Sequence, residues 1–232
     1  MREKDRGAWW QYLLLLFTIH CSLFTLSCTQ DAYDKGEGAY SLMRADFVEA
    51  HANAEKKVDY VETDDGERLT LTTPVSASWI DTADSVYRCI LYYNKVEDAR
   101  GTQSAQPLSI GQVPCPSFRS PSEMEVVTDP VKFESLWRSK SGKYVNMRFL
   151  LMTGMTDDTT AVNNLALIAD TVQVNPDSTR TRYLRLHHER VAVPEYYSTE
   201  VFLSIPSERI EADSLCISVN TYDGVVTRTI KR

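Results

Sequence analysis

The sequence predicts an all-β protein, and three observations lead to that prediction. Apolar and polar residues alternate with a period of two in short runs after residue 57, which is the pattern of strands with one buried face. Turn-forming residues, including two Asp-Gly pairs, separate the runs. Helical patterns are scarce. Because 43% of the 232 residues are hydrophobic, the chain can bury a core, and short, regularly spaced strands are typical of sandwiches and barrels.

Residues 1–27 have the pattern of a lipoprotein signal peptide. Basic residues near the start precede an apolar run from Ala8 to Leu26, and Ser27-Cys28 follows. This order is typical of an export signal with a small residue before the cleavage site. The cysteine directly after that site predicts lipid attachment at Cys28, which would anchor the chain firmly in a membrane. An uncleaved transmembrane anchor is the alternative, since the apolar run is almost long enough to span a bilayer.

Residues 28–38 predict an acidic, flexible tether, because they are polar and rich in turn formers. Their acidic residues loosely resemble the signal that sends some lipoproteins of Gram-negative anaerobes to the cell surface. A solvated tether without such a signal is the alternative. We therefore expect an exported protein, lipid-anchored in the cell envelope at the outer membrane, with its periplasmic or surface side left open.

Residues 39–115 predict the first β domain. Runs at 57–62 and 68–72 flank Asp64-Asp65-Gly66, which is a hairpin signal. Further strands are expected at 85–93 and 108–113. This segment also holds Cys89 and Cys115, 26 positions apart, and export would place them where a disulfide can persist. One bridge between them is the expected pairing, and two unlinked buried thiols are the alternative; Cys216 has the surroundings of a small core residue.

Residues 116–128 predict a linker, since Pro and Ser cluster there. Residues 129–232 predict the second β domain. Its first segment, 129–137, begins like a helix with Asp before Pro, but its alternation favours a strand. The later strands are expected at 144–152, 164–174, 181–187, 200–205, 215–222 and 225–230, with the last turn at Asp223-Gly224.

The charge is concentrated in the first half of the mature chain. The whole sequence carries a formal net charge of -7. Residues 28–115 hold 8 basic and 15 acidic side chains, whereas residues 116–232 hold 14 and 15. An acidic domain opposes binding to nucleic acid, whose phosphates attract basic surfaces.

Three segments resemble the NigD-like family of bacterial lipoproteins. They are the Gly-Ala-Tyr-Ser-Leu stretch at 38–42, the Trp-Arg-Ser and Gly-Lys-Tyr-Val-Asn stretch at 137–149, and Phe-Leu-Ser-Ile-Pro at 202–206. The resemblance implies an OB-like barrel followed by a β-sandwich, and a link, by name and operon context, to immunity against a secreted bacteriocin. Lys140-Ser141 and the Pro/Ser-rich 114–122 depart from the family pattern. We expect Trp137 and Tyr144 to pack across a hairpin, and Asn146 to hold a loop backbone.

Motifs of known catalytic or metal sites are missing from the sequence, so we predict a protein that is not an enzyme and needs no cofactor or metal. The segment most similar to a metal-binding motif is His187-His188-Glu189, but adjacent strand residues point to opposite faces. Asp64-Asp65-Gly66-Glu67 and Asp157-Asp158 lack the ligand spacing of a calcium loop. A hydrolase with two distant carboxylates is the least favoured alternative.

The predicted function is therefore binding. We expect a non-enzymatic, lipid-anchored envelope protein that contacts the membrane through its lipid and binds a protein or peptide partner, with bacteriocin immunity as the specific hypothesis. The alternative is a surface carbohydrate-binding module that stacks Trp79, Tyr92 and Tyr93 on sugar rings, unless alternation buries these aromatics. The oligomeric state stays open.

Overall fold

The computed structural model describes residues 38, 40–97 and 101–232. The predicted signal peptide, Cys28 and nearly all of the tether lie outside these residues. The chain divides into two compact units, Met1–Leu42 and Met43–Arg232, and every described strand belongs to the second. Within the described part of the chain, no helix has the length and apolar character needed to cross a membrane.

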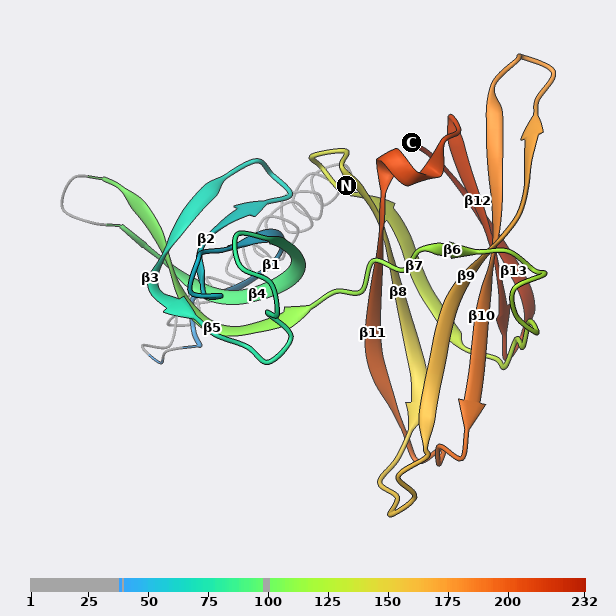
Figure 1. Cartoon of the computed structure of the whole chain (residues 1–232), viewed down its shortest axis with the longest axis horizontal. Helices are drawn as coiled ribbons and strands as arrows, with labels where there is room; N and C mark the ends of the chain where they lie inside the picture. Colours follow the sequence, from blue (N-terminus) through green and yellow to red (C-terminus); the bar gives the residue numbers. More distant parts are fainter. Residues whose placement is uncertain (1–37, 39, 98–100) are drawn as a thin grey trace, which may run out of the picture. The chain divides into compact units, whose positions relative to one another are not determined.

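The first half of the second unit is a closed five-stranded barrel with the strand order β1-β2-β3-β5-β4 (Figure 1). Its strands are β1 (Met43–Ala52), β2 (Val58–Thr63), β3 (Arg68–Val75), β4 (Val86–Glu97) and β5 (Gln103–Gln112). All pairings are antiparallel except that of β3 with β5. The turn between β2 and β3 contains Gly66 at φ 81°, a backbone conformation that glycine adopts without strain, so the predicted Asp-Gly hairpin is confirmed.

Alternate residues of the barrel strands fill its interior. On β4 the side chains of Cys89, Leu91 and Tyr93 are fully buried in one core cluster with residues of the other strands. The residues that alternate with them on β4, Arg88, Ile90 and Tyr92, therefore point out of the barrel. This outward face of β4 lies against the second half of the unit.

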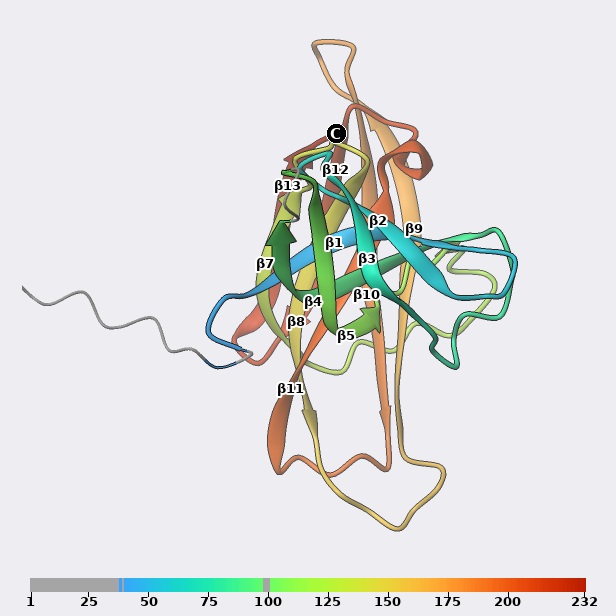
Figure 2. The ribbon, with the colours of Figure 1, turned by 90° about the vertical axis from the view of Figure 1, so that its left-hand side faces the viewer.

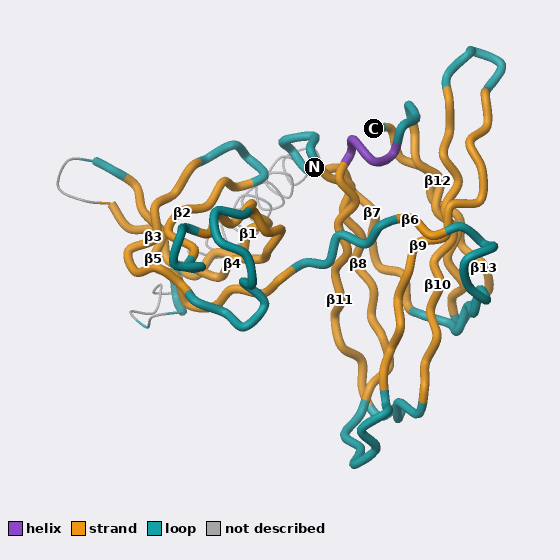
Figure 3. Tube along the Cα trace, in the orientation of Figure 1, coloured by secondary structure: helices purple, strands orange, loops and turns teal. Residues whose placement is uncertain are grey.

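The second half is a sandwich of two sheets, whose long strands can be followed in Figure 2. Residues from strands of both sheets share one core. One sheet has the order β13-β12-β10-β9-β6 and the other the order β11-β8-β7. The strands are β6 (Phe118–Arg119), β7 (Lys132–Arg138), β8 (Tyr144–Thr153), β9 (Val162–Val174), β10 (Arg180–Val191), β11 (Tyr197–Pro206), β12 (Ser214–Thr221) and β13 (Gly224–Lys231). A 3-10 turn, η1 (Ser207–Ile210), follows β11 (Figure 3).

The three-stranded sheet has two covered faces. On β8 the side chains of Val145, Met147 and Phe149 enter the sandwich core. Asn146, between them, is also fully buried, although it must point the other way. It faces the barrel, as does Ser204 on the neighbouring strand β11, which pairs with it in register.

The all-β prediction, with an OB-like barrel before a sandwich, is confirmed. Segment 129–137 forms most of strand β7 (Lys132–Arg138), as its alternation favoured. The final hairpin is present, but Thr221 pairs with Gly224, so its turn lies one residue earlier than expected. A short strand, β6, lies inside the predicted linker and pairs with β9.

Strand β1 was not predicted. Its inward residues are Val48, Ala50 and Ala52, and alanine has a weak preference for strands. Apolar and polar residues do alternate in β1, but the apolar side chains are too small for the pattern to stand out in the sequence.

Candidate functional site: the barrel–sandwich groove

Arg88 is the central residue where barrel and sandwich meet. Its side chain is 2% exposed, and its guanidinium forms a bidentate ion pair with Asp64, with nitrogen–oxygen distances of 2.8 and 2.7 Å. The same guanidinium donates to Asn146 Oδ1 at 3.2 Å and lies 3.4 Å from Ser204 Oγ. Ser204 Oγ in turn donates to Asn146 Oδ1 at 2.7 Å. We call these four residues the Arg88 clamp, because they join the barrel to the sandwich.

Aromatic rings surround the clamp. The Arg88 guanidinium lies 4.0 Å from the centre of the Tyr144 ring and 5.1 Å from that of Phe47. Phe47 packs edge-on against Trp137 and Phe202, with ring centres 5.6 and 5.3 Å apart. Trp137 and Tyr144 were expected to pack across their own hairpin. Instead, both rings contact residues of the barrel, since they lie on the outer face of the sheet.

Ion pairs form the rim of this contact. Lys143 pairs with Glu49, and Lys140 pairs with Asp65 at 2.9 Å. The Tyr144 hydroxyl donates to Glu49 Oε1 at 2.9 Å. Burial alone would raise the pKa of Glu49, but the hydrogen bonds from Lys143 and Tyr144, with the nearby positive charges, lower it below its usual value. Glu49 is therefore ionised at neutral pH.

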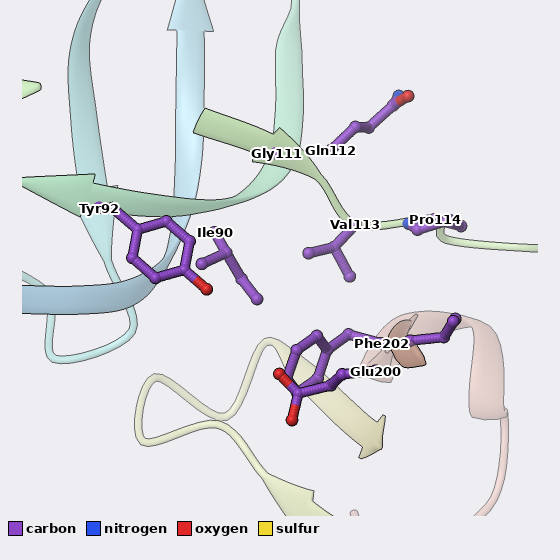
Figure 4. Close-up of a pocket in the computed structure, with 9 residues that line it drawn as sticks. Ile90, Tyr92, Gly111, Gln112, Val113, Pro114, Glu200 and Phe202 are labelled. Atoms are coloured by element: carbon purple, nitrogen blue, oxygen red, sulfur yellow. The ribbon is translucent and has the colours of Figure 1, made fainter. Parts of the chain in front are cut away.

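Beside the clamp lies an apolar groove of about 320 Å³ (Figure 4). Barrel and sandwich each contribute one wall. Its lining residues are Ile90, Tyr92, Gly111, Gln112, Val113, Pro114, Glu200, Val201 and Phe202. The only charged lining residue is Glu200, whose carboxylate pairs with Arg148. The groove thus offers apolar contacts with few competing charges, as ligand sites commonly do.

The edge of β11 runs along the groove. Ser204 N–H donates to Pro114 O at 3.0 Å, so this N–H points away from the partner strand β8. Backbone groups of an antiparallel strand alternate in direction, and those of Glu200 and Phe202 therefore point the same way. Among the described strands, only β8 pairs with β11, which leaves the backbone of Glu200 and Phe202 available at the groove.

The three predicted sugar-facing aromatics lie in three different environments. Tyr92 lines the groove. Tyr93 is fully buried, and its hydroxyl donates to Asp46 Oδ2 at 2.7 Å, so the prediction that it faces a ligand is wrong. Adjacent residues of one strand point to opposite faces. Trp79 packs on the barrel core and edge-on against Tyr87, away from the groove.

The bridge expected between Cys89 and Cys115 is not formed in the structure, where both thiols are free. Cys89 points into the barrel core, whereas Cys115 lies in the connecting segment, with its thiol 3.8 Å from Val113 O. Cys216 is also free and buried, as its apolar surroundings predicted.

The His187-His188-Glu189 segment serves packing. Both histidines are 2% exposed. His187 Nδ1 accepts a hydrogen bond from Val127 N–H at 3.0 Å, and His188 Nδ1 lies 3.1 Å from Asp129 O. The pair thereby ties the chain before β7 to strand β10.

Sequence reasoning missed Arg88 and Asp64 as functional residues. A signal was available for Arg88, which is flanked on β4 by outward residues that are themselves apolar, Ile90 and Tyr92. An apolar outward face indicates that something covers it. The partners of Arg88 on the sandwich are 58 and 116 positions away, which no local pattern can reveal.

Comparison with known proteins identifies the fold. No model of a protein family matches the sequence, and no curated protein does. Solved structures do match. A NigD-like immunity protein from Bacteroides caccae has a TM-score of 0.59 at 18% identity, covering 80% of this chain and 91% of that one.

Two further structures agree. A protein of unknown function from Bacteroides vulgatus has a TM-score of 0.60 at 16% identity, covering 82% of this chain and 90% of that one. A proposed lipoprotein from Bacteroides fragilis has a TM-score of 0.54 at 14% identity, covering 82% and 96%. The chain therefore shares the fold of a NigD-like immunity protein, as the resemblance in its sequence implied.

Proposed function

We propose that the chain is a non-enzymatic, lipid-anchored protein of the cell envelope that binds a peptide or protein partner in the barrel–sandwich groove. The lipid anchor rests on the pattern ending at Cys28 and on the likeness to a proposed lipoprotein. The partner class, a secreted bacteriocin, is what the resemblance of the sequence to the NigD-like family implies, and the likeness to a solved NigD-like immunity protein supports that family.

The observation that carries the binding proposal is the unpaired edge of β11 beside apolar side chains. An extended peptide can add to such an edge through its backbone, while pockets beside the edge select its side chains. Ser204 N–H already donates a hydrogen bond to Pro114 O on this edge. A partner strand would continue from that point along Phe202 and Glu200, with an apolar side chain against Ile90 and Tyr92.

Two substitutions test this geometry against matched controls. Glu200→Pro removes the outward N–H, and proline is tolerated where an edge strand faces solvent; Pro206 occupies the same side of the same strand. Glu200→Ala keeps the N–H but loses the ion pair with Arg148. Tyr92→Ser removes the aromatic ring from the wall of the groove. Its control, Tyr222→Ser, changes an exposed tyrosine of another hairpin.

The measurement is affinity capture of the anchored protein from intact cells, followed by mass spectrometry. The wild type and both controls should retain a common partner. Glu200→Pro and Tyr92→Ser should reduce its recovery at least about tenfold, the loss expected from about 1.4 kcal/mol. Equal recovery by all five proteins would place the partner elsewhere on the surface.

Immunity has a separate test. A strain that lacks the gene should become more sensitive to a toxin secreted by neighbouring cells, and the Tyr92→Ser variant should not restore protection. Unchanged sensitivity to every neighbour's toxin would reject immunity while leaving the groove proposal open to the capture result.

A carbohydrate partner is the second candidate, and the position of Tyr92 in the groove favours it, since an aromatic wall can stack on a sugar ring. It predicts binding on a glycan array that Tyr92→Ser abolishes and Glu200→Pro leaves intact, because a sugar needs no strand edge. A silent array would reject this candidate.

A further inference from the structure

Three metal-ligating side chains meet on the outside of the barrel, away from the groove residues. Glu49 and His51 lie two positions apart on β1, and Glu62 lies directly opposite Glu49 on β2. They consequently share one face of the sheet. One potential ligand atom from each residue lies within 4.8 Å of the other two. Local sequence patterns missed this set, because Glu62 is brought in by the strand register.

The His51 ring is held in place by stacking. It lies parallel to the Tyr60 ring with 4.2 Å between ring centres, and the Arg68 guanidinium lies 3.8 Å from the centre of the same Tyr60 ring. His51 Nε2 is buried, yet it has no hydrogen-bond partner within the described part of the chain. A buried polar atom without a partner is costly, so it calls for an explanation.

Lys143 neutralises the two carboxylates of the cluster but does not supply a partner for His51. Carboxylates directly opposite each other on paired strands repel, and the Lys143 ammonium offsets this by pairing with Glu49 and lying 3.8 Å from Glu62. It forms no hydrogen bond with His51 Nε2. The Lys143 side chain is 53% exposed, whereas that of Glu49 is 16% exposed. The ammonium can therefore leave for solvent while the carboxylate stays in place.

We propose that Glu49, His51 and Glu62 form a binding site for one divalent transition-metal ion, with zinc as the best-matched ion, and that the metal replaces the Lys143 ammonium. One imidazole and two carboxylates are a ligand set that zinc accepts, with water completing four-coordination. The Tyr144 hydroxyl, which binds the other oxygen of Glu49, would orient that ligand as outer-shell partners do. The proposal is independent of the groove and of its partner.

A purely structural cluster and a metal site predict different effects on ion binding when Lys143 is removed. If the cluster is only an ion-pair network, loss of Lys143 leaves two unpaired carboxylates and no ion binds with useful affinity. If it is a metal site, Lys143 competes with the ion, so its loss tightens binding. Lys143→Met, which keeps much of the side-chain length without the charge, separates the two.

The experiment is titration calorimetry of the purified, chelator-treated full chain with zinc chloride. We expect one saturable site whose affinity falls at least about tenfold in His51→Gln and in Glu62→Gln, the scale of losses at metal sites, and rises in Lys143→Met. Glu55→Gln, an exposed carboxylate on the neighbouring turn, is the matched control and should leave the affinity unchanged. Thiols that bind zinc would be insensitive to all four substitutions.

Thermal unfolding with and without zinc checks that each variant folds, and Lys143→Gln replaces Lys143→Met if the latter does not. Zinc should raise the melting temperature of the wild type and of Lys143→Met, but not that of His51→Gln. The proposal is overturned if no one-to-one binding is seen, if His51→Gln binds as tightly as the wild type, or if loss of Lys143 weakens binding.

Discussion

A buried guanidinium is costly unless its donors have partners, and those of Arg88 come from both halves of the unit. Asp64 supplies the opposite charge from the barrel, and Asn146 supplies an acceptor from the sandwich. Replacing Arg88 would leave a carboxylate and an amide without their partner, which costs more than the pair contributes. Arg88 therefore holds the barrel and the sandwich together, because its partners come from both.

Cysteine reactivity is a second property decided by single residues. Burial raises the pKa of the Cys89 thiol to about 12, and it raises the pKa of the half-buried Cys115 thiol as well. Because the thiolate is the reactive form, Cys89 should resist iodoacetamide at pH 8 until the protein unfolds, and Cys115 should react first. Peptide mass spectrometry after timed labelling measures both rates. Equal rates in the folded protein would contradict the burial of Cys89 in the barrel core.

For strand β4, the sequence analysis named more ligand-facing residues than one face of the strand can hold. Tyr92 and Tyr93 were both named as aromatics that could face a sugar if alternation did not bury them, but a period of two allows only one of the two to face outward. The choice between them depends on which face meets the core, and that is decided by strands distant in the sequence. Arg88 was missed for the same reason, since its role depends on Asp64 and Asn146, which only the fold brings next to it.

Among the elements, β10 carries an acid-sensitive contact. Burial lowers the pKa of the His188 imidazole below its usual value, with Asp129 O and Asn163 Oδ1 near its two nitrogens. Protonation then favours the unfolded chain, so the stability is complete above the unfolded pKa of about 6.5 and falls as the pH drops below it.

Urea unfolding at pH 7.5 and pH 5.5 measures this loss. For one group the slope cannot exceed about 1.4 kcal/mol per pH unit. His188→Gln keeps a polar side chain without titrating, so it should reduce the difference between the two pH values. An unchanged difference in His188→Gln would assign the acid sensitivity to other groups.

Most elements could be predicted from the sequence because their alternation is built from large side chains. Strands β8 to β12 have inward Leu, Ile, Val and Phe residues, and their predicted positions agree with the structure to within a few residues. Strand β1 has small inward residues, and β6 has only two residues. Neither carries enough apolar surface for a local pattern, and each is stabilised by its partner strands, β2 and β4 for β1 and β9 for β6.

At the scale of the whole molecule, the Arg88 clamp should make barrel and sandwich unfold together. We expect one calorimetric transition for the wild type. Arg88→Met should lower stability by about 3–5 kcal/mol, as the loss of one partner of a buried pair does, and should separate the barrel and sandwich transitions. Arg228→Met, on the exposed strand β13, should keep the single transition. A single transition in both variants would show that the aromatic contacts suffice for coupling.

The two-module architecture could be predicted from turn signals and from the resemblance to a family, but the site between the modules could not. Its walls come from β4, β5 and β11, and Ile90 and Phe202, which line the groove from the barrel and from the sandwich, lie far apart in the sequence. Local periodicity states which residues face outward. It does not state what they face.

The order of the strands along the chain has a consequence for folding. All five barrel strands lie in one continuous segment and precede the strands of the sandwich, so the whole barrel sequence is synthesised before the sandwich strands. Until the sandwich forms, the outer face of β4 is exposed, with Ile90 and Tyr92 as adhesive surface for other chains. Once the sandwich has formed, it covers part of this surface, and the groove is the part that stays open.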